Sequence, residues 1–242
     1  HFYLLSQESG FSFPQSAFEK LQKMFNFIDW ATIDGVGIVK IGDDDSGKIL
    51  HYGITPSLIA SMKQQRLTHD IMFKKFGLSV HKTDTWHVTL RHHSYTKEQP
   101  SGHFHNDIGS VTIAYKGIPI IVDPGSYVYT PSVEWRNTFR SAKVHNGFFI
   151  EDVEPVLFSE SSLFVLDLPE KKCHDPIWKI KHNLYSIEAS RSMVIDDDSE
   201  FVIFKDSWQE MPAQGCMSVW NFTLAPDIEP QDKPELRLFC HW

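Results

Sequence analysis

Residues 102–129 read Gly-His-Phe-His-Asn-Asp-Ile-Gly-Ser-Val-Thr-Ile-Ala-Tyr-Lys-Gly-Ile-Pro-Ile-Ile-Val-Asp-Pro-Gly-Ser-Tyr-Val-Tyr. Two runs of strand-forming residues, 108–116 and 118–122, are separated here by the turn dipeptide Lys116-Gly117. Short strands joined by tight turns are typical of antiparallel sheets. Polar residues with metal-binding and catalytic chemistry flank both runs, so this stretch bears on function as well as on fold.

The strand pattern continues on both sides of this stretch. From Asp84 onward, apolar residues at 86, 88 and 90 alternate with more polar ones, as in a half-buried strand. Further strands are predicted at 147–150, 153–158, 162–168, 177–190, 192–196, 200–207, 216–225 and 235–241. Many strands with no helical period between them predict a mainly β protein built as an antiparallel β-sandwich.

The N-terminal third has a different pattern. Residues 14–30 show apolar positions at helical spacing behind a proline suited to a first helical turn, and we expect this face to pack on neighbouring helices or on the sheet. Shorter helices are predicted at 56–65 and near 68–76. We therefore divide the chain into a helical part with a linker, residues 1–80, and a sandwich domain, residues 81–242.

Composition limits the function classes. The chain has 242 residues, 41 % of them hydrophobic, and a net charge of −8, which argues against nucleic acid as a partner. No apolar run reaches the roughly 18 residues of a membrane span. Three widely spaced cysteines do not indicate a disulfide framework. The sequence begins at His1, so we interpret it as a piece of a longer protein; no leader is visible, and export to the periplasm or medium stays an expectation.

A candidate metal site surrounds the opening stretch. His103 and His105 form an H-x-H pair, and alternate residues of a strand point to one face. Asp123 ends an apolar run and His145 follows 22 residues later. Two imidazoles and a carboxylate suit a catalytic zinc arrangement with an open position, and also other divalent metals.

These residues also resemble a known family. The runs His103-Phe-His105-Asn-Asp, Asp123-Pro-Gly and His145-Asn146, with tyrosines and arginines between them, are similar to the heparinase II/III-like polysaccharide lyases. The resemblance is strongest over residues 84–150 and extends weakly back to 41–47. It implies a sandwich of the super-sandwich type, preceded by the last helices of an α/α toroid.

The resemblance further implies roles for individual residues. His105, Asp123 and His145 would hold a structural divalent metal, with Zn²⁺ favoured over Ca²⁺. Asp107 and Asn146 lie nearby in the sequence and are candidates to fix the ligand histidines. His103 and Tyr129 would be catalytic. The residues implied to bind substrate are Tyr127, Arg136 and Arg140. The family's remaining catalytic groups belong to an upstream toroid, so we expect little activity from this chain alone.

The implied reaction is β-elimination at a uronic acid. A base removes the C5 proton, the bond from C4 to oxygen breaks, and the developing charge beside the carboxylate must be stabilised. The substrate would be an acidic polysaccharide such as a glycosaminoglycan, alginate or a bacterial exopolysaccharide. Forked hydrogen bonds from an arginine would suit its carboxylate or sulfate groups.

Several alternatives compete with this interpretation. The same ligands also suit a cupin-like metal oxygenase or hydrolase, because two histidines and a carboxylate can hold non-haem iron. The sandwich could instead be a non-catalytic carbohydrate-binding or structural module. Tyr129 could serve only in packing, and Arg136 could be a solvated or ion-paired surface group. Asp43, Asp45 and Gly47 weakly match a calcium loop, but Ile54 stands where an EF-hand needs a carboxylate, so we expect a solvated loop or a supporting role.

Overall fold

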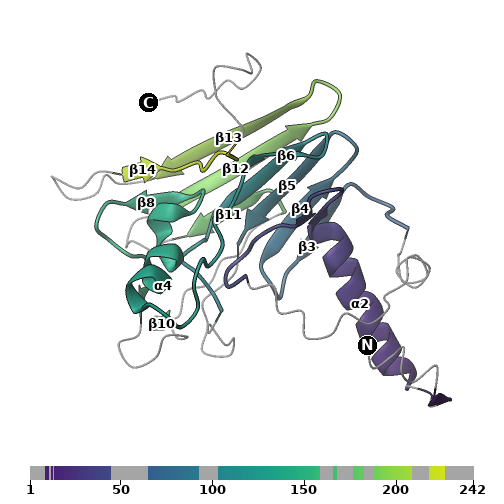
Figure 1. The fold of residues 1–242 in the computed structure, drawn as a ribbon. Coiled ribbons are helices and arrows are strands. Elements are labelled where there is room, and N and C mark those ends of the chain that lie inside the picture. Colours follow the sequence, from purple (N-terminus) through teal and green to yellow (C-terminus); the bar gives the residue numbers. More distant parts are fainter. Residues whose placement is uncertain are drawn as a thin grey trace.

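Five antiparallel strands form the larger sheet of the protein. The computed structural model describes residues 9–10, 12, 14–44, 65–92, 103–158, 166–167, 177–182, 188–208 and 218–226. The sheet has the order β3-β4-β5-β6-β7, comprising Asp70–Phe73, Leu78–Lys82, Trp86–Arg91, Val111–Tyr115 and Ile118–Ile121. All its neighbours pair antiparallel, which confirms the predicted sheet type (Figure 1).

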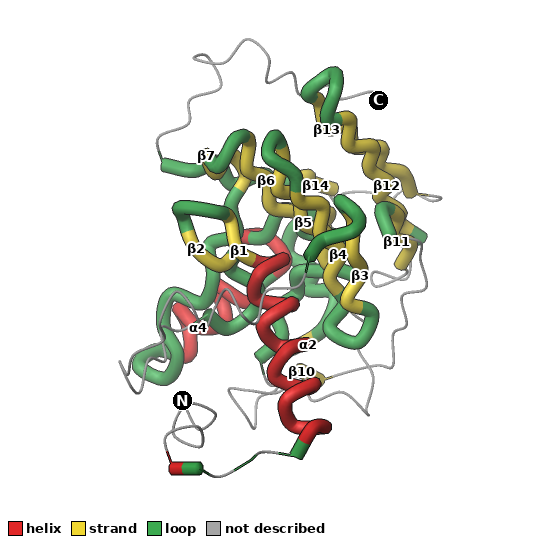
Figure 2. The backbone as a smooth tube through the Cα atoms, turned by 90° about the vertical axis from the view of Figure 1, so that its right-hand side faces the viewer, coloured by secondary structure: helices red, strands yellow, loops and turns green. Residues whose placement is uncertain are grey.

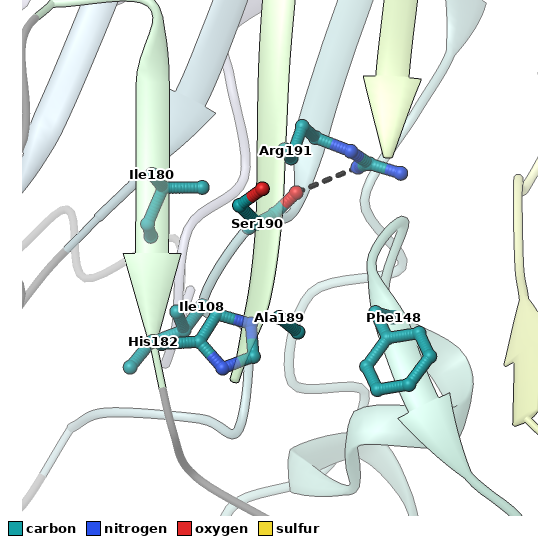
Figure 3. A pocket seen from close by; sticks show the side chains of 8 residues that line it. Ile108, Phe148, Ile180, His182, Ala189, Ser190 and Arg191 are labelled. Atoms are coloured by element: carbon teal, nitrogen blue, oxygen red, sulfur yellow. Dashed lines mark hydrogen bonds between the residues drawn. The ribbon is translucent and has the colours of Figure 1, made fainter. Parts of the chain in front are cut away.

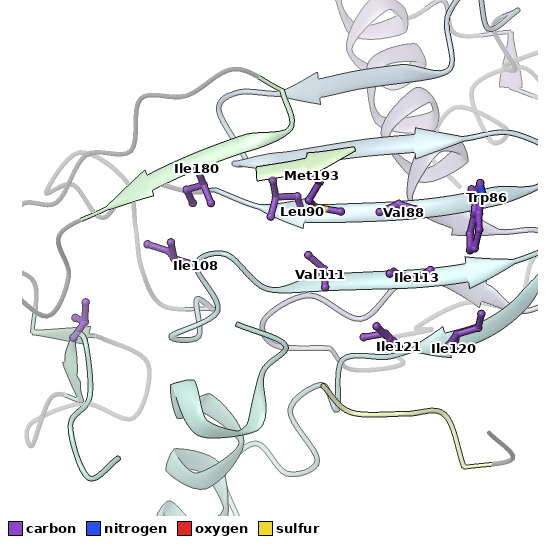
Figure 4. Packing of buried hydrophobic residues seen from close by; sticks show 11 residues of the cluster. Trp86, Val88, Leu90, Ile108, Val111, Ile113, Ile120, Ile121, Ile180 and Met193 are labelled. Carbon is purple, nitrogen blue, oxygen red and sulfur yellow. The ribbon is translucent and has the colours of Figure 1, made fainter. Parts of the chain in front are cut away.

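A second sheet packs on the first. It has the order β11-β12-β13, comprising Lys179–His182, Ala189–Asp196 and Phe201–Trp208. Ile180 from β11 and Met193 from β12 belong to the same buried cluster as Val88, Leu90 and Val111 of the larger sheet (Figure 4). Apolar side chains of two sheets therefore share one core, and the predicted mainly β antiparallel sandwich is confirmed.

Short strand pairs complete the β structure. They are β1–β2 (Thr32–Ile33 and Gly37–Ile38), β9–β10 (Leu157–Phe158 and Leu166–Asp167) and β8–β14 (Phe148–Ile150 and Ser218–Trp220). Within the described residues the predicted strands are therefore largely confirmed, although several are shorter than expected. The strand predicted at 235–241 lies outside the described residues.

Helix α2 (Gln15–Ala31) confirms the first predicted helix and reaches the sheet at its C-terminal end (Figure 2). Trp30 is buried, and its carbonyl accepts a hydrogen bond from His87 Nε2 at 2.8 Å. Lys82 Nζ donates to the carbonyls of Asp29 and Thr32, so a cation satisfies the last turn of the helix. The predicted packing face included Met24 and Ile28, and the prediction is wrong for both, because they are 61 % and 42 % exposed. Among the described helices, none is long and apolar enough to cross a membrane.

Two other elements differ from the prediction. The helix expected near 68–76 is wrong, because Asp70–Phe73 pairs with Leu78–Lys82 across a turn. The sheet therefore begins at Asp70, while the division of domains at residue 80 remains an expectation. The helix expected at 56–65 falls almost entirely outside the described residues. Helix α4 (Val133–Arg140) was not predicted; the Ser132 side chain caps it by accepting from the Trp135 amide at 3.3 Å.

Candidate functional site

The predicted site residues lie on loops and helix ends at one edge of the sandwich. His103 and His105 precede β6 in irregular backbone, so their expected placement on a strand is wrong. Asp123 follows β7 as predicted, and His145 caps the 3₁₀ helix η1 (Ala142–Val144). Although the H-x-H pair is not in a strand, both of its rings reach one carboxylate, which belongs to Asp43.

Asp43 is the centre of the polar network. Its Oδ2 lies 3.0 Å from His103 Nδ1 and its Oδ1 lies 3.0 Å from His105 Nε2. Arg136 binds both oxygens as a fork, with 2.7 Å from its Nη2 to Oδ2. Burial opposes ionisation, but the hydrogen bonds from His105 and Arg136 outweigh it and hold the pKa of Asp43 far below its ordinary value. Asp43 is therefore a carboxylate with both oxygens occupied, and the alternative of a solvated loop is wrong at this position.

The backbone before Asp43 is fitted closely to the H-x-H loop. Gly42 has a φ of +61°, a conformation that side chains with a Cβ rarely adopt. A Cβ at this position would collide with the carbonyl oxygen of His103. The amide of Asp43 donates to that same carbonyl at 3.1 Å. Glycine at position 42 therefore permits the contact that brings Asp43 to both histidines.

His105, His145 and Asp123 form the inner part of the site. The rings of His105 and His145 lie 5.2 Å apart between centroids, and both are buried. His145 Nδ1 lies 2.7 Å from Asp123 Oδ2, while Asp123 Oδ1 accepts from the Gly125 amide at 2.9 Å. Burial alone would lower the pKa of His145, but the charge and hydrogen bond of Asp123 raise it overall. The surroundings of His145 therefore favour positive charge.

This inner group has the right chemistry for a metal but not a complete ligand arrangement. Within the described part of the chain, His145 Nε2 is buried and makes no hydrogen bond. A histidine whose other nitrogen is held by a carboxylate is a common arrangement for a metal ligand. However, no group of three or more ligand side chains among the described residues is set out to hold an ion. The donor types thus fit a metal. Asp123 contacts the Nδ1 of His145, so in this structure it supports that histidine.

The outer part of the site is open to solvent. The His103 side chain is 70 % exposed, and its Nδ1 lies 2.5 Å from the Tyr129 hydroxyl. The guanidinium carbon of Arg136 lies 4.8 Å from the centre of the Tyr129 ring, a cation–π distance. The predicted catalytic pair His103 and Tyr129 is therefore brought into contact, above the buried arginine.

An exposed group of aromatic rings lies on and beside α4. Tyr127 is 68 % exposed and stacks on Phe139, with 5.1 Å between ring centroids. Trp135 is 52 % exposed and packs edge-on against Tyr127 at 5.7 Å. Tyr127 adopts a positive φ of 54°, which is uncommon for an aromatic residue and is often found at functional sites.

The two predicted substrate-binding arginines are buried. Arg136 and Arg140 are both 0 % exposed and form the inner face of α4. The alternative for Arg136 is therefore wrong about a surface position, although Arg136 is ion-paired as it allowed. Arg136 is engaged by Asp43, and Arg140 lies over the Phe158 ring at 5.2 Å. Their predicted contact with substrate remains untested. In this structure the charge of Arg136 is compensated by the buried carboxylate of Asp43.

Asn146 and Asp107 were expected to fix the ligand histidines; the hydrogen bonds described here hold other groups beside the site. Asn146 Nδ2 donates to the carbonyls of Val111 and Val122, each at 2.9 Å, which joins the start of β6 to the end of β7. Asp107 is buried and accepts from Arg91 at 3.0 Å. These contacts hold the loops that carry His105 and Asp123 on the edge of the larger sheet.

A small cavity lies elsewhere, between β11, β12 and β8 (Figure 3). Its volume of about 10 Å³ is that of a single water position. Ile108, His182 and Arg191 line it, and none of the predicted metal or catalytic residues does. Arg191 donates to the carbonyl of Asn146 at 2.8 Å, so this region supports the backbone beside His145.

Comparison with solved structures identifies the fold. A heparinase III structure superposes with a TM-score of 0.57 and 18 % identity, covering 81 % of this chain and 33 % of that one. Heparan sulfate lyase HepC from Pedobacter heparinus gives 0.51 and 14 %, over 75 % of this chain and 31 % of that one. A further heparinase III structure gives 0.55 and 14 %, over 80 % and 34 %. This chain therefore spans about a third of the length of these structures.

Sequence comparison agrees with the structural one. No curated protein matches the chain significantly. The family described as heparinase II/III-like, C-terminal, matches residues 65–238, which include both sheets and every residue of the site except those at 42–44. The chain therefore belongs to the heparinase II/III-like family and contains its C-terminal domain.

Proposed function

We propose that this chain is the C-terminal part of a polysaccharide lyase that cleaves a uronate-containing acidic polysaccharide by β-elimination. Family membership supports this class of reaction. The observation that carries the proposal is the exposed His103 ring, held from behind by Asp43 and in contact with the Tyr129 hydroxyl. A base and a hydroxyl acid side by side at an open surface are the groups that this reaction requires.

The roles follow from what each side chain can reach. Nδ1 of His103 is turned to Asp43 and Tyr129, so Nε2 is the nitrogen available to take the C5 proton or to bind the uronate carboxylate. Tyr129 can give a proton to the departing C4 oxygen. Positioned acids and bases of this kind contribute on the order of 10²–10⁴-fold in rate. The remaining catalytic groups would come from a helical domain outside this chain.

His105, Asp123 and His145 would hold a divalent metal. Two imidazoles with one carboxylate favour Zn²⁺, because Ca²⁺ prefers a shell of oxygen ligands. Bound there, the ion would order the loops that carry the catalytic pair. The Asp123 carboxylate, 2.7 Å from His145 Nδ1, supports this assignment because its negative charge favours a cation nearby.

The exposed aromatic rings would bind sugar. Tyr127 and Trp135 present flat apolar surfaces next to Tyr129, and aromatic rings stack on the faces of sugars. Arg136 and Arg140 stay the candidate arginines for the anionic groups of the substrate, although both are buried and Arg136 is paired with Asp43. The structural likeness to heparinases favours a glycosaminoglycan, while alginate and bacterial exopolysaccharide are the alternative substrates.

The experiment is an assay of the full-length protein on heparan sulfate, alginate and a neutral glycan. Formation of the unsaturated uronate is followed by absorbance, and His103→Ala is compared with His69→Ala, which changes an exposed histidine outside the site. We expect activity on an acidic polysaccharide that is lost only in the first variant. Glycan binding without cleavage in the wild-type protein would instead favour a carbohydrate-binding module, for which the exposed Tyr127 and Trp135 are the supporting observation.

A further inference from the structure

We propose that Asp43 is a positioning residue that fixes the two histidines of the H-x-H pair in opposite tautomers. His103 would carry its proton on Nδ1 and His105 on Nε2. The Nε2 of His103 could then accept a proton or a hydrogen bond from the substrate. The Nδ1 of His105 would carry a lone pair in the inner part of the site. The expected effect on catalysis rests on the proposed lyase function. The assignment of the two tautomers does not depend on that function.

The first step of the argument is the chemistry of the carboxylate. An ionised carboxylate accepts hydrogen bonds and cannot donate them. Each ring nitrogen that faces Asp43 at 3.0 Å must therefore carry a hydrogen, and these are Nδ1 of His103 and Nε2 of His105. The two rings present different nitrogens to the same group, so one carboxylate sets two opposite tautomers.

The second step is the rigidity of Asp43. Its side chain is 3 % exposed, so water does not compete for its oxygens. Arg136 binds both oxygens from another direction and fixes the plane of the carboxylate. On the backbone side, Ser126 Oγ donates to the Asp44 carbonyl at 2.9 Å and accepts from the Asp44 amide at 3.3 Å. The linker segment is thus attached to the loop that follows Asp123.

The third step concerns Tyr129. Its hydroxyl lies 2.5 Å from the same Nδ1 of His103. When Nδ1 carries a hydrogen, the tyrosine oxygen can only accept there, and its own proton is left for another partner. Without the carboxylate, the hydroxyl would donate to Nδ1 and the ring proton would move to Nε2. Asp43 therefore determines whether His103 or Tyr129 is the hydrogen-bond donor in this contact. Both members of the catalytic pair are affected by it.

The matched variants are Asp43→Asn and Asp44→Asn in the full-length protein. Both remove one negative charge from the same segment, but the Asp44 side chain is exposed and outside the network. An asparagine at 43 offers an oxygen to only one of the two histidines, and the histidine nitrogen that faces its NH₂ must accept instead. We expect kcat to fall by about 10²–10⁴-fold in Asp43→Asn with little change in KM. Asp44→Asn should behave as wild type.

The second readout is independent of activity. Long-range ¹H–¹⁵N spectra of histidine-labelled protein report which ring nitrogen carries the proton. We expect the Nδ1–H form for His103 and the Nε2–H form for His105 in the wild type, and loss of the wild-type form in one of these two histidines in Asp43→Asn. A wild-type His103 in the Nε2–H form would overturn the proposal, even if the variant did not fold. So would equal kcat values for the two variants. If the protein cleaves no polysaccharide, the proposed function fails and the spectra still decide the role of Asp43.

Discussion

The carboxylate of Asp43 and the guanidinium of Arg136 form a forked ion pair with side chains 3 % and 0 % exposed. The pair joins the segment after β2 to helix α4, 93 residues later in the chain. A buried pair of this kind costs desolvation to form, but removing one partner leaves the other as an uncompensated charge. The pair therefore attaches the segment around Asp43 to helix α4 and fixes its carboxylate in contact with the two histidines.

Replacing the arginine should destabilise the protein strongly. We expect Arg136→Gln to lower the free energy of unfolding by about 3–5 kcal/mol, because Asp43 stays buried without its cation. Urea unfolding followed by circular dichroism measures the change. Arg66→Gln is the control, since its pair with Asp29 is partly exposed and should contribute at most about 1 kcal/mol. Similar losses in both variants would contradict a special role for the buried pair.

Metal content tests the inner site. We expect the purified protein to carry one equivalent of zinc and His145→Ala to carry none, while His69→Ala keeps it. A chelator should lower the melting temperature of wild type and leave His145→Ala unchanged, because a ligand that binds only the folded state stabilises it by about 2.7 kcal/mol at 100 times its Kd. Elemental analysis and a thermal melt give both results. Wild-type protein without bound metal, unaffected by added zinc, would reject this assignment.

The sequence predicted the sandwich well because strand alternation is local. Residues 86–91 show it plainly, and the structure places them in β5. Helix α4 was missed because its buried face is made of Arg136 and Arg140, so a search for apolar periodicity finds no inner face. Helical propensity was misleading near 68–76, where tertiary pairing gives a strand instead.

The candidate site was predicted only in part, because some of its contacts join residues that are far apart in the sequence. His103, His105, Asp123 and His145 come together. A supporting role was one of the two expectations for the loop of Asp43, but its contact with both histidines of the H-x-H pair was not predicted. Asp43 is 60 residues from His103 and lies in a run of turn-forming residues that looks solvated. The signals in this segment were the weak calcium-loop match of Asp43 and the weak family resemblance over 41–47. Long-range pairing of this kind cannot be read from spacing.

Stability should fall in mild acid because of a buried neutral histidine. Burial lowers the pKa of His87 to about 4, while its Nε2 donates to the Trp30 carbonyl. Between pH 6.5 and 4 the unfolded chain binds a proton that the folded protein does not, so stability decreases as the pH falls through this window. The contribution of His87 is about 3 kcal/mol in total.

The matched variants for this pH effect are His87→Gln and His69→Gln. The glutamine amide can still donate to the Trp30 carbonyl, but it does not titrate. Urea unfolding at several pH values should therefore give a smaller slope of stability against pH for His87→Gln. His69 is exposed, and its variant should keep the wild-type slope. An unchanged slope in His87→Gln would show that another group, such as His92 with its pKa also lowered to about 4 by burial, dominates this range.

Gly42 lies against the H-x-H loop, so an alanine at this position should destabilise the protein. Gly42→Ala should cost more than Gly35→Ala, although both glycines have positive φ, of +61° and +80°. At Gly35 a Cβ meets nothing within 4 Å, so that variant measures backbone strain alone, of order 1 kcal/mol. At Gly42 the added carbon also meets the carbonyl of His103, and Asp43 must shift with it. We therefore expect the free energy of unfolding, measured in urea, to fall by about 1 kcal/mol more in Gly42→Ala than in Gly35→Ala. We also expect lyase activity to fall in Gly42→Ala only, because the same shift moves Asp43 away from both rings.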